Sequence, residues 1–410
     1  MLEKTPRGNR LHIGIFGKRN AGKSSLINAL TGQNIAIVSD ALGTTADPVF
    51  KSMELAGIGP VVFIDTAGFD DSGELGQLRV AKTESIIGRC DIAILVIDST
   101  NMELEQEETW MERLQKASVP TITVLNKSDA LDDTEHMITM NIATEFTDRA
   151  GLPAPIAVSA TTGDGIAALR KAIQDCVPDE YIQEKILGDI LEDGSLVLLV
   201  MPQDIQAPKG RLILPQVQTI RELLDRKCTV VSTTADNFAS ALSSIKRAPD
   251  LIITDSQCFD LVYEQKPETS ALTSFSILMA AAKGDINAFV DGVSAIDDAL
   301  SDSSHNFRVL IAEACTHVPL NEDIGTVKIP RLLQKAFGNR VSIKNVRGND
   351  FPDIDELKQY DLIIHCGACM FNRRHVLSRI AAAQEAGIPI TNYGIFLAKM
   401  AGILDKVVLP

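Results

Sequence analysis

The sequence predicts an α/β protein of two or three domains whose sheets are mainly parallel. At 410 residues the chain is longer than one ordinary hydrophobic core supports. Short, continuously apolar runs alternate with segments of helical periodicity along most of its length. Such runs are typical of strands that helices cover on both faces, and this arrangement favours parallel sheets.

Composition and charge narrow the class of protein. Hydrophobic residues make up 45% of the chain and charged residues 23%, as in soluble globular proteins. No apolar run reaches the roughly 20 residues that span a bilayer, and residues 1–7 hold no signal-peptide core. The net charge of −15 disfavours a nucleic acid or an anionic membrane as partner. We expect a cytoplasmic protein in a reducing compartment, since seven cysteines form no disulfide framework in a chain of this size.

The first apolar run leads directly into a loop that is typical of phosphate binding. The loop Gly17-Lys-Arg-Asn-Ala-Gly22-Lys23-Ser24 has the pattern G-x-x-x-x-G-K-S, and a helical segment follows it. Gly17 and Gly22 let backbone N–H groups face a β-phosphate at the start of that helix. Lys23 would bridge the β- and γ-phosphates, and the Ser24 hydroxyl would ligate Mg²⁺. By itself the pattern is also compatible with a glycine turn before a helix.

Two further segments complete a site for Mg²⁺ and the γ-phosphate. An apolar run ends in Asp65-Thr-Ala-Gly68, where Asp65 would hold the Mg²⁺ shell through water and the Gly68 N–H would meet the γ-phosphate. Between this motif and the phosphate loop, Thr44 and Thr45 lie in what looks like a first switch loop. In such loops one threonine ligates Mg²⁺ only when the γ-phosphate is present, and we favour Thr45.

The base-recognition motifs follow at the ends of later apolar runs. In Asn126-Lys127-Ser-Asp129, the carboxylate of Asp129 can accept two hydrogen bonds from guanine, whereas adenine offers no matching donor. The backbone of Ser159 and Ala160, after another apolar run, would read the guanine O6. Because these motifs occur in this order, each at the end of a predicted strand, we no longer consider the first loop a simple glycine turn before a helix.

A GTPase domain is therefore expected at residues 8–177. The residues expected to bind GTP or GDP are Gly17, Asn20, Gly22, Lys23, Ser24, Ser25, Asp65, Asn126, Lys127, Asp129, Ser159 and Ala160. The expected catalytic groups are Lys23, Thr45 and Gly68, and the expected Mg²⁺ ligands are Ser24 and Thr45.

The loop G-x-x-N-x-G-K-S-S and the G-T-T switch resemble the translation-factor-related GTPases of the TrmE–Era group. The resemblance implies that Asn20 helps to coordinate K⁺ beside the phosphates, as in the potassium-activated members. The alternative for Asn20 is a loop residue bonded to its own backbone. Phe69 occupies the position of the catalytic glutamine of Ras-like proteins, so we expect slow, Mg²⁺-dependent hydrolysis.

Beyond the first domain the chain returns to α/β alternation. A middle domain is expected at 183–268; it shows no catalytic constellation and is a candidate for self-association. A long helical stretch is expected from Ser270 to about Leu300, within a C-terminal domain at 269–410. The predicted architecture is thus a P-loop GTPase domain followed by two smaller α/β domains with mainly parallel sheets.

Two cysteine–histidine clusters follow predicted strands of the C-terminal domain. They are Cys315-Thr-His317 and His365-Cys366-Gly-Ala-Cys369. Open α/β sheets place ligands at such strand ends, so we predict that the three cysteines converge on one metal centre. Tetrahedral zinc and a [4Fe–4S] cluster both fit the cysteines. His317 and His365 could supply a fourth ligand or orient the centre, although adjacent His and Cys side chains point apart.

The combination of both parts resembles the HydF family of GTPases, which mature [FeFe]-hydrogenase, over essentially the whole chain. The resemblance implies a homodimeric scaffold or carrier whose [4Fe–4S] cluster is ligated by Cys315, Cys366 and Cys369, with His317 and His365 matching the motif histidines. It implies that radical-SAM maturases assemble a transient diiron subcluster on the scaffold, which delivers it to apo-[FeFe]-hydrogenase. GTP binding or hydrolysis would then shift affinity for these partners.

Two other functions stay open on sequence alone. An RNA-modification or ribosome-assembly GTPase would suit the first domain, but the acidic charge and the lack of a recognisable RNA-binding module oppose it. A GTPase with a purely structural zinc site would suit the cysteine pattern. Metal analysis separates zinc from an iron–sulfur cluster.

Overall fold

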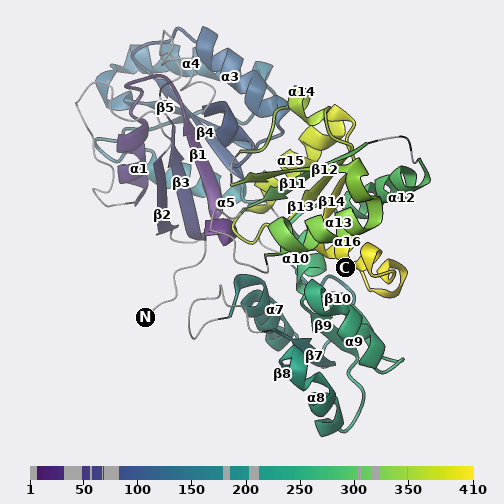
Figure 1. Cartoon of the computed structure of the whole chain (residues 1–410). Helices are drawn as coiled ribbons and strands as arrows, with labels where there is room; N and C mark the ends of the chain where they lie inside the picture. The colour runs from purple at the N-terminus through teal and green to yellow at the C-terminus, as the bar shows by residue number, and fades with distance from the viewer. Residues whose placement is uncertain are drawn as a thin grey trace. The chain divides into compact units, whose positions relative to one another are not determined.

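The computed structural model describes residues 7–31, 49–55, 58–66, 68, 83–178, 185–202, 212–302, 304, 306–314, 323–348 and 350–410. The chain divides into two compact units, Met1–Gln183 and Glu184–Pro410 (Figure 1). Within the described ranges, no helix is both long and apolar enough to cross a bilayer.

The described part of the first unit is built on one sheet with strand order β2-β3-β1-β4-β5-β6. The strands are β1 (Leu11–Phe16), β2 (Val49–Leu55), β3 (Gly59–Asp65), β4 (Ile92–Asp98), β5 (Thr121–Asn126) and β6 (Ile156–Ala157). Every described pairing is parallel except that of β2 with β3. Strand β1 lies between β3 and β4. The strands that follow β1 in the sequence are therefore added first on one side of it and then on the other. Ligands bind at the carboxyl ends of strands at such a switch point.

Helices cover both faces of this sheet. They are α1 (Lys23–Thr31), α3 (Glu105–Lys116), α4 (Asp133–Arg149) and α5 (Ile166–Asp175). One apolar core joins the strands to Leu26 of α1 and Ile173 of α5, and a second joins them to Trp110 of α3 and Phe146 of α4. Burial on both faces explains why β1 and β4 are mainly apolar.

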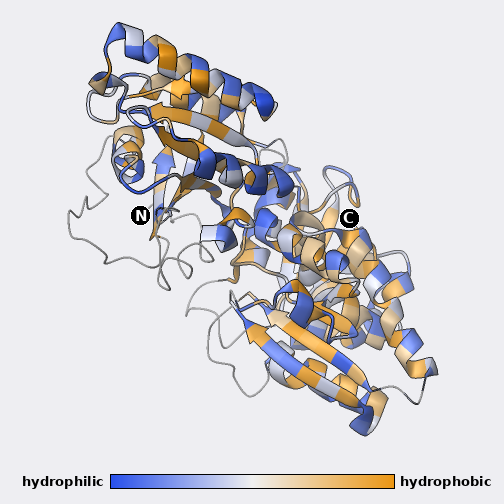
Figure 2. Cartoon of the chain, turned by 90° about the horizontal axis from the view of Figure 1, so that it is seen from above, coloured by the Kyte–Doolittle hydropathy of each residue, from blue (hydrophilic) through white to orange (hydrophobic). Residues whose placement is uncertain are grey.

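The second unit contains two parallel sheets. One has the order β10-β9-β7-β8, formed by β7 (Leu196–Val200), β8 (Thr229–Thr233), β9 (Leu251–Thr254) and β10 (Ala271–Ser274). The other has the order β12-β11-β13-β14, formed by β11 (Phe307–Glu313), β12 (Val341–Arg347), β13 (Leu362–His365) and β14 (Ile390–Asn392). Figure 2 shows the apolar colour concentrated on the strands and on the helix faces that pack against them. The predicted fold class is confirmed.

Along the sequence, the described helices of the second unit alternate with these strands. They are α7 (Leu214–Asp225), α8 (Phe238–Ser244), α9 (Phe259–Gln265), α10 (Phe275–Lys283), α11 (Ile286–Gly292), α12 (Ser294–Ser301), α13 (Ile329–Phe337), α14 (Ile354–Leu357), α15 (Arg373–Ala386) and α16 (Tyr393–Met400). Several of these helices begin directly after a residue whose side chain caps the first turn, and this residue determines where the helix starts.

The prediction of one long helical stretch from Ser270 is wrong. The stretch begins with strand β10, which pairs with β9 and carries the first sheet past residue 268, where a new domain was expected. Ser274 then caps α10 by accepting a hydrogen bond from the Ile277 N–H. Asp285 caps α11, so the sequence Gly284-Asp285 separates these two helices.

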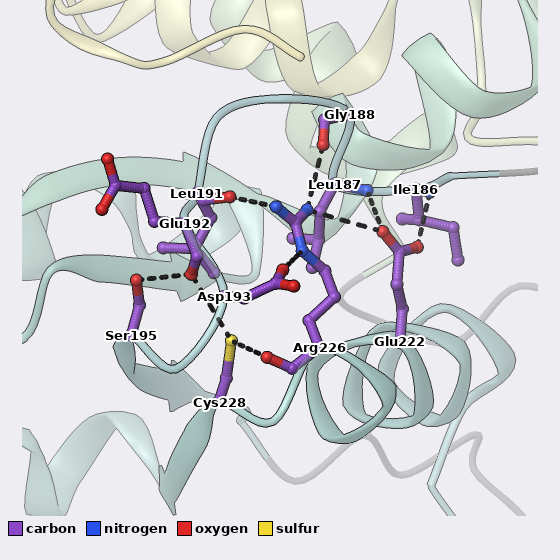
Figure 3. A network of polar contacts seen from close by, with 10 residues as sticks. All are labelled: Ile186, Leu187, Gly188, Leu191, Glu192, Asp193, Ser195, Glu222, Arg226 and Cys228. Carbon is purple, nitrogen blue, oxygen red and sulfur yellow. Dashed lines mark hydrogen bonds and ion pairs between the residues drawn. The ribbon is translucent and has the colours of Figure 1, made fainter.

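Glu222 of α7 and Arg226, which directly follows that helix, fix the first described segment of the second unit (Figure 3). The Glu222 carboxylate accepts hydrogen bonds from the backbone N–H groups of Ile186, at 2.6 Å, and Leu187, at 3.1 Å. Arg226 donates to the Gly188 carbonyl at 3.0 Å. Charge-assisted bonds to backbone groups therefore hold this segment against the helix.

Candidate functional site

The phosphate loop leaves β1 in a conformation that requires both of its motif glycines. Gly17 has φ +153° and Gly22 has φ +88°, where a side chain is strained. An added Cβ would lie 2.4 Å from the Val96 carbonyl oxygen at Gly17, and 2.1 Å from the Asn126 amide nitrogen at Gly22. Close approach of the backbone to its neighbours, as well as to phosphate, explains the pattern.

Lys23 is buried and lies over the same loop. Its ammonium donates to the carbonyl oxygens of Gly17 and Lys18, each at 2.8 Å. Its positive charge is thus held at the start of α1, where the helix dipole and the loop N–H groups also favour an anion. The loop, the lysine and the helix end together suit a nucleotide phosphate.

The two described groups that were expected to organise Mg²⁺ are in contact. The Ser24 hydroxyl donates to the Asp65 carboxylate at 2.7 Å. Strand pairing brings them together, since Ile15 of β1 is the register partner of Asp65 at the end of β3. A hydroxyl and a carboxylate oxygen are ligands that Mg²⁺ accepts. Thr45, the expected third group, lies outside the described residues, and Gly68 is half-buried.

Asn126 acts as a brace between loops. Its side-chain amide donates to the Ala21 carbonyl at 2.8 Å and accepts from the Ala160 N–H at 3.1 Å. The Ala160 N–H, which was expected to read the guanine O6, is therefore engaged by Asn126 in this structure. Asp129 is exposed at the same end of the sheet, as expected for a group that meets the base.

Two residues that the sequence prediction missed complete these loops. The Asp98 carboxylate, at the end of β4, pairs with the Lys127 ammonium at 2.5 Å. The Asp164 carbonyl accepts a hydrogen bond from the Ser159 N–H at 3.0 Å. The position of Asp98 directly after an apolar run was the available signal. Asn20 is exposed with φ +61°, a conformation that asparagine tolerates.

The cysteine site of the second unit lies at a switch point. Strand β11 has β12 on one side and β13 on the other, so the crevice between β11 and β13 opens at their carboxyl ends. His365 is the last residue of β13. Cys366 follows it and donates its backbone N–H to the Ala312 carbonyl at 3.0 Å.

The Cys366 sulfur sits in a small cradle of backbone donors. It accepts hydrogen bonds from the Ala314 N–H at 3.0 Å and the Ala368 N–H at 3.4 Å. Burial raises the pKa of the Cys366 thiol to about 11, while these two bonds and the Arg379 charge act in the opposite direction. Donors that converge on sulfur are the arrangement that stabilises a metal-bound thiolate. The described residues thus fit a metal–thiolate centre.

Both ring nitrogens of His365 have partners in this structure. One ring nitrogen, Nδ1, lies 2.8 Å from the Cys366 carbonyl oxygen, and the other, Nε2, lies 3.0 Å from an Arg379 nitrogen. Burial and the Arg379 charge lower the pKa of His365 to about 3, so the imidazole is neutral. Ligation of a metal by His365 would require one of these contacts to break.

The remaining groups of the predicted centre are described only in part. Cys315 and His317 lie outside the described residues, and Cys369 is half-buried with no disulfide. Across the described ranges, no three His, Cys, Asp or Glu side chains already converge as a metal site. Two residues that the sequence did not signal hold the loop: Asn392 donates to the Cys366 carbonyl at 3.3 Å, and the buried Lys283 donates to the Phe371 carbonyl at 2.7 Å.

The phosphate loop with its Mg²⁺ and base motifs defines a P-loop GTPase. A second, parallel α/β unit with a cysteine at its switch point is appended to it. Comparison with family models agrees for each part. Residues 12–127 match the 50S ribosome-binding GTPase model. Residues 186–284 match the hydrogen maturase F dimerization domain, and residues 287–410 match the hydrogen maturase F tetramerization domain. The last two models together cover more than half of the chain, which belongs to the hydrogen maturase F family.

Individual relatives match the GTPase part. GTPase Der of Wolinella succinogenes is 40% identical over 131 residues, which are 31% of this chain and 27% of that protein. The tRNA modification GTPase MnmE of Chromobacterium violaceum is 33% identical over 168 residues, 41% of this chain and 35% of that protein. The match thus spans about a third of these curated relatives. A solved structure of Era with MgGDPNP and 16S ribosomal RNA is 19% identical, with 54% of this chain and 91% of that chain covered at a TM-score of 0.37.

Proposed function

We propose that this chain is a cytoplasmic, GTP-hydrolysing scaffold that carries a [4Fe–4S] cluster and delivers a diiron subcluster to apo-[FeFe]-hydrogenase. The observation that carries the proposal is the Cys366 thiol, which accepts two backbone hydrogen bonds at the switch point of a domain matched by a hydrogen maturase F model. The match of the middle region to the dimerization model of the same family supports it.

In the GTPase unit, each of the residues predicted from sequence has a defined task. Lys23 and the loop N–H groups bind the β- and γ-phosphates, while Ser24, Thr45 and Asp65 organise Mg²⁺. Asp129 selects guanine. Asn20 takes part in binding K⁺, so replacing K⁺ by Na⁺ lowers the rate of GTP turnover. Equal rates in both salts would contradict this role of Asn20.

In the second unit, Cys315, Cys366 and Cys369 would hold the cluster. With three thiolate ligands, the cluster would supply an iron that can accept a further ligand. The chain's own contribution is to orient the thiols: backbone donors from Ala314 and Ala368 fix the Cys366 sulfur, and Asn392 fixes its carbonyl. His365 positions the loop through its bond to the Cys366 carbonyl.

Self-association takes place through both matched domains. In the region matched by the dimerization model, α7 exposes Val217 by 43% and Leu224 by 57%, and the preceding Leu212 is exposed by 42%. Exposed apolar side chains on one helix are the kind of surface that a second copy covers. Strand β8 ends the sheet beside them and leaves one edge open within the described residues.

A transfer assay tests delivery directly. The chain is produced together with the radical-SAM maturases, purified, and added to apo-[FeFe]-hydrogenase. Hydrogen evolution should appear with the wild-type chain and be lost with Cys366→Ser. The bound nucleotide is then varied, since GTP-bound and GDP-bound forms are expected to differ in affinity for the maturases and the hydrogenase. Equal affinities in both forms would leave the nucleotide without a gating role.

A further inference from the structure

We infer that Arg379 is a positioning residue for a metal–thiolate centre formed at Cys366. Its buried positive charge, which His365 links to the Cys366 backbone, stabilises the more negative, reduced state of that centre. The inference rests on the proposed cluster-carrying function and adds to it a residue outside the cysteine motif. The positive charge of Arg379 and the hydrogen bonds through His365 that hold it in place are the features that matter.

Arg379 lies on α15 and is almost completely buried, with 3% of its surface exposed. One guanidinium nitrogen lies 3.0 Å from the Nε2 atom of His365, and the other donates to the Gly348 carbonyl. The group also packs over two rings, 4.8 Å from the centre of Phe351 and 4.7 Å from that of Phe371. These contacts, on several sides of a planar group, leave it a single position.

The contact with His365 connects this position to the cysteine loop. The opposite ring nitrogen of His365 lies 2.8 Å from the carbonyl oxygen of Cys366. Because a guanidinium can only donate and a carbonyl can only accept, the His365 Nε2 accepts from Arg379 and its Nδ1–H donates to the Cys366 carbonyl. Arg379, His365 and the Cys366 backbone therefore form one chain of hydrogen bonds, in which Arg379 carries the positive charge.

This charge is permanent and acts on the thiol. A guanidinium stays protonated across the pH range in which proteins fold, so Arg379 cannot lose its charge through burial. Two hydrogen bonds, from Arg379 to His365 and from His365 to the Cys366 carbonyl, fix this charge close to the residue that bears the thiol. Charge interactions are stronger in buried surroundings than at the surface. A centre of metal and thiolates that gains an electron becomes more negative and is stabilised by the same charge.

A redox titration of the full-length, anaerobically reconstituted chain tests the inference. The variants are Arg379→Gln, which removes the charge; Arg379→Lys, which keeps it; and Arg331→Gln, which removes an exposed charge from α13. Each is titrated with dithionite in the presence of mediator dyes, and the reduced centre is followed by EPR. At a fixed potential, Arg379→Gln should lower the ratio of reduced to oxidised centre about tenfold, which is about 59 mV for one electron. Arg379→Lys and Arg331→Gln should match the wild type.

Several results would overturn the inference. One is a folded, loaded Arg379→Gln chain with the wild-type potential; another is an Arg379→Lys chain shifted as far as Arg379→Gln. If thermal denaturation shows that Arg379→Gln does not fold, Arg379→Met takes its place as the variant without the charge, and a folded, loaded Arg379→Met chain with the wild-type potential overturns the inference. A wild-type chain that takes up neither iron nor sulfide overturns the proposed function and this inference with it, whereas a loaded wild type with an unaffected variant overturns the inference alone.

Discussion

Asn126 and Ala21 are joined by a 2.8 Å hydrogen bond from the asparagine amide to the alanine carbonyl, across 105 residues of sequence. The bond ties the phosphate loop to the base-recognition loop. Asn126 is 2% exposed, and its oxygen accepts a second bond from the Ala160 N–H. One side chain thus joins the phosphate loop to the base-recognition loops.

Asn126→Ala should weaken binding of GDP and GTP about tenfold or more. It leaves the Ala21 carbonyl and the Ala160 N–H without their partner, at a cost of about 1–3 kcal/mol for buried groups. Calorimetric titration with GDP measures the change. Asn141→Ala, at an exposed position on α4, is the matched control and should bind like the wild type. Equal affinities of both variants would remove the bracing role of Asn126.

Asp129→Asn should change the base preference from guanine to xanthine. The carboxylate accepts from two guanine donors, each bond to a charged group being worth about 1.5–3 kcal/mol, so GTP affinity should fall about a hundredfold. An asparagine amide can donate to the second carbonyl of xanthine and accept from its ring N–H. Competition between GTP and XTP for a fluorescent nucleotide measures both effects, with Asp133→Asn as control. Unchanged preference in the Asp129 variant would contradict the assigned role.

Arg221 of α7 and Arg226, which directly follows the helix, should differ sharply in their effect on stability. Arg226, whose side chain is 20% exposed, pairs with Asp193 and bonds to backbone carbonyls; its replacement by alanine should cost about 1–3 kcal/mol. Arg221 pairs with Asp225 where both are exposed, by 77% and 56%, so Arg221→Ala should cost about 1 kcal/mol or less. Urea unfolding followed by circular dichroism compares them. Equal losses would mean that Arg226 does not anchor the segment before β7.

His365 should make the metal-free second unit sensitive to acid. Burial lowers its pKa from 6.5 to about 3, so between these values the unfolded chain binds one proton more than the folded chain. Stability from this group is complete above pH 6.5 and falls as the pH drops toward 3, by at most about 1.4 kcal/mol per pH unit. His365→Asn should flatten this dependence in urea unfolding, whereas His136→Gln on α4 should not. An equally steep fall in both variants would show that other groups cause it.

The GTPase part could be predicted almost completely from sequence. Its motifs are short, local and placed at strand ends, so each indicates both a structure and a chemistry. What the motifs could not indicate is how side chains and backbone groups pair across the loops. Asn126 was predicted to take part in nucleotide binding. Nothing in the sequence indicates that its amide also joins Ala21 and Ala160, because these contacts lie between loops that are distant in sequence.

The second unit could be predicted less completely. The strands before Cys315 and Cys366 were expected, but β10 was taken as part of a helix. Its four residues, Ala271–Ser274, precede an apolar helix without a glycine or proline to mark the change. Arg379 and Asn392 gave no signal either, since their importance depends on tertiary contacts with His365 and Cys366.

The proposal that the chain carries an iron–sulfur cluster is tested most directly by iron, sulfide and zinc analysis of anaerobically purified protein, with EPR after reduction. Cys258→Ser is the matched control for Cys366→Ser, because burial also raises the pKa of the Cys258 thiol to about 11. We predict about four irons and four sulfides per chain in the wild type and in Cys258→Ser, and their loss in Cys366→Ser. One zinc without sulfide, or full iron and sulfide in Cys366→Ser, would contradict the account.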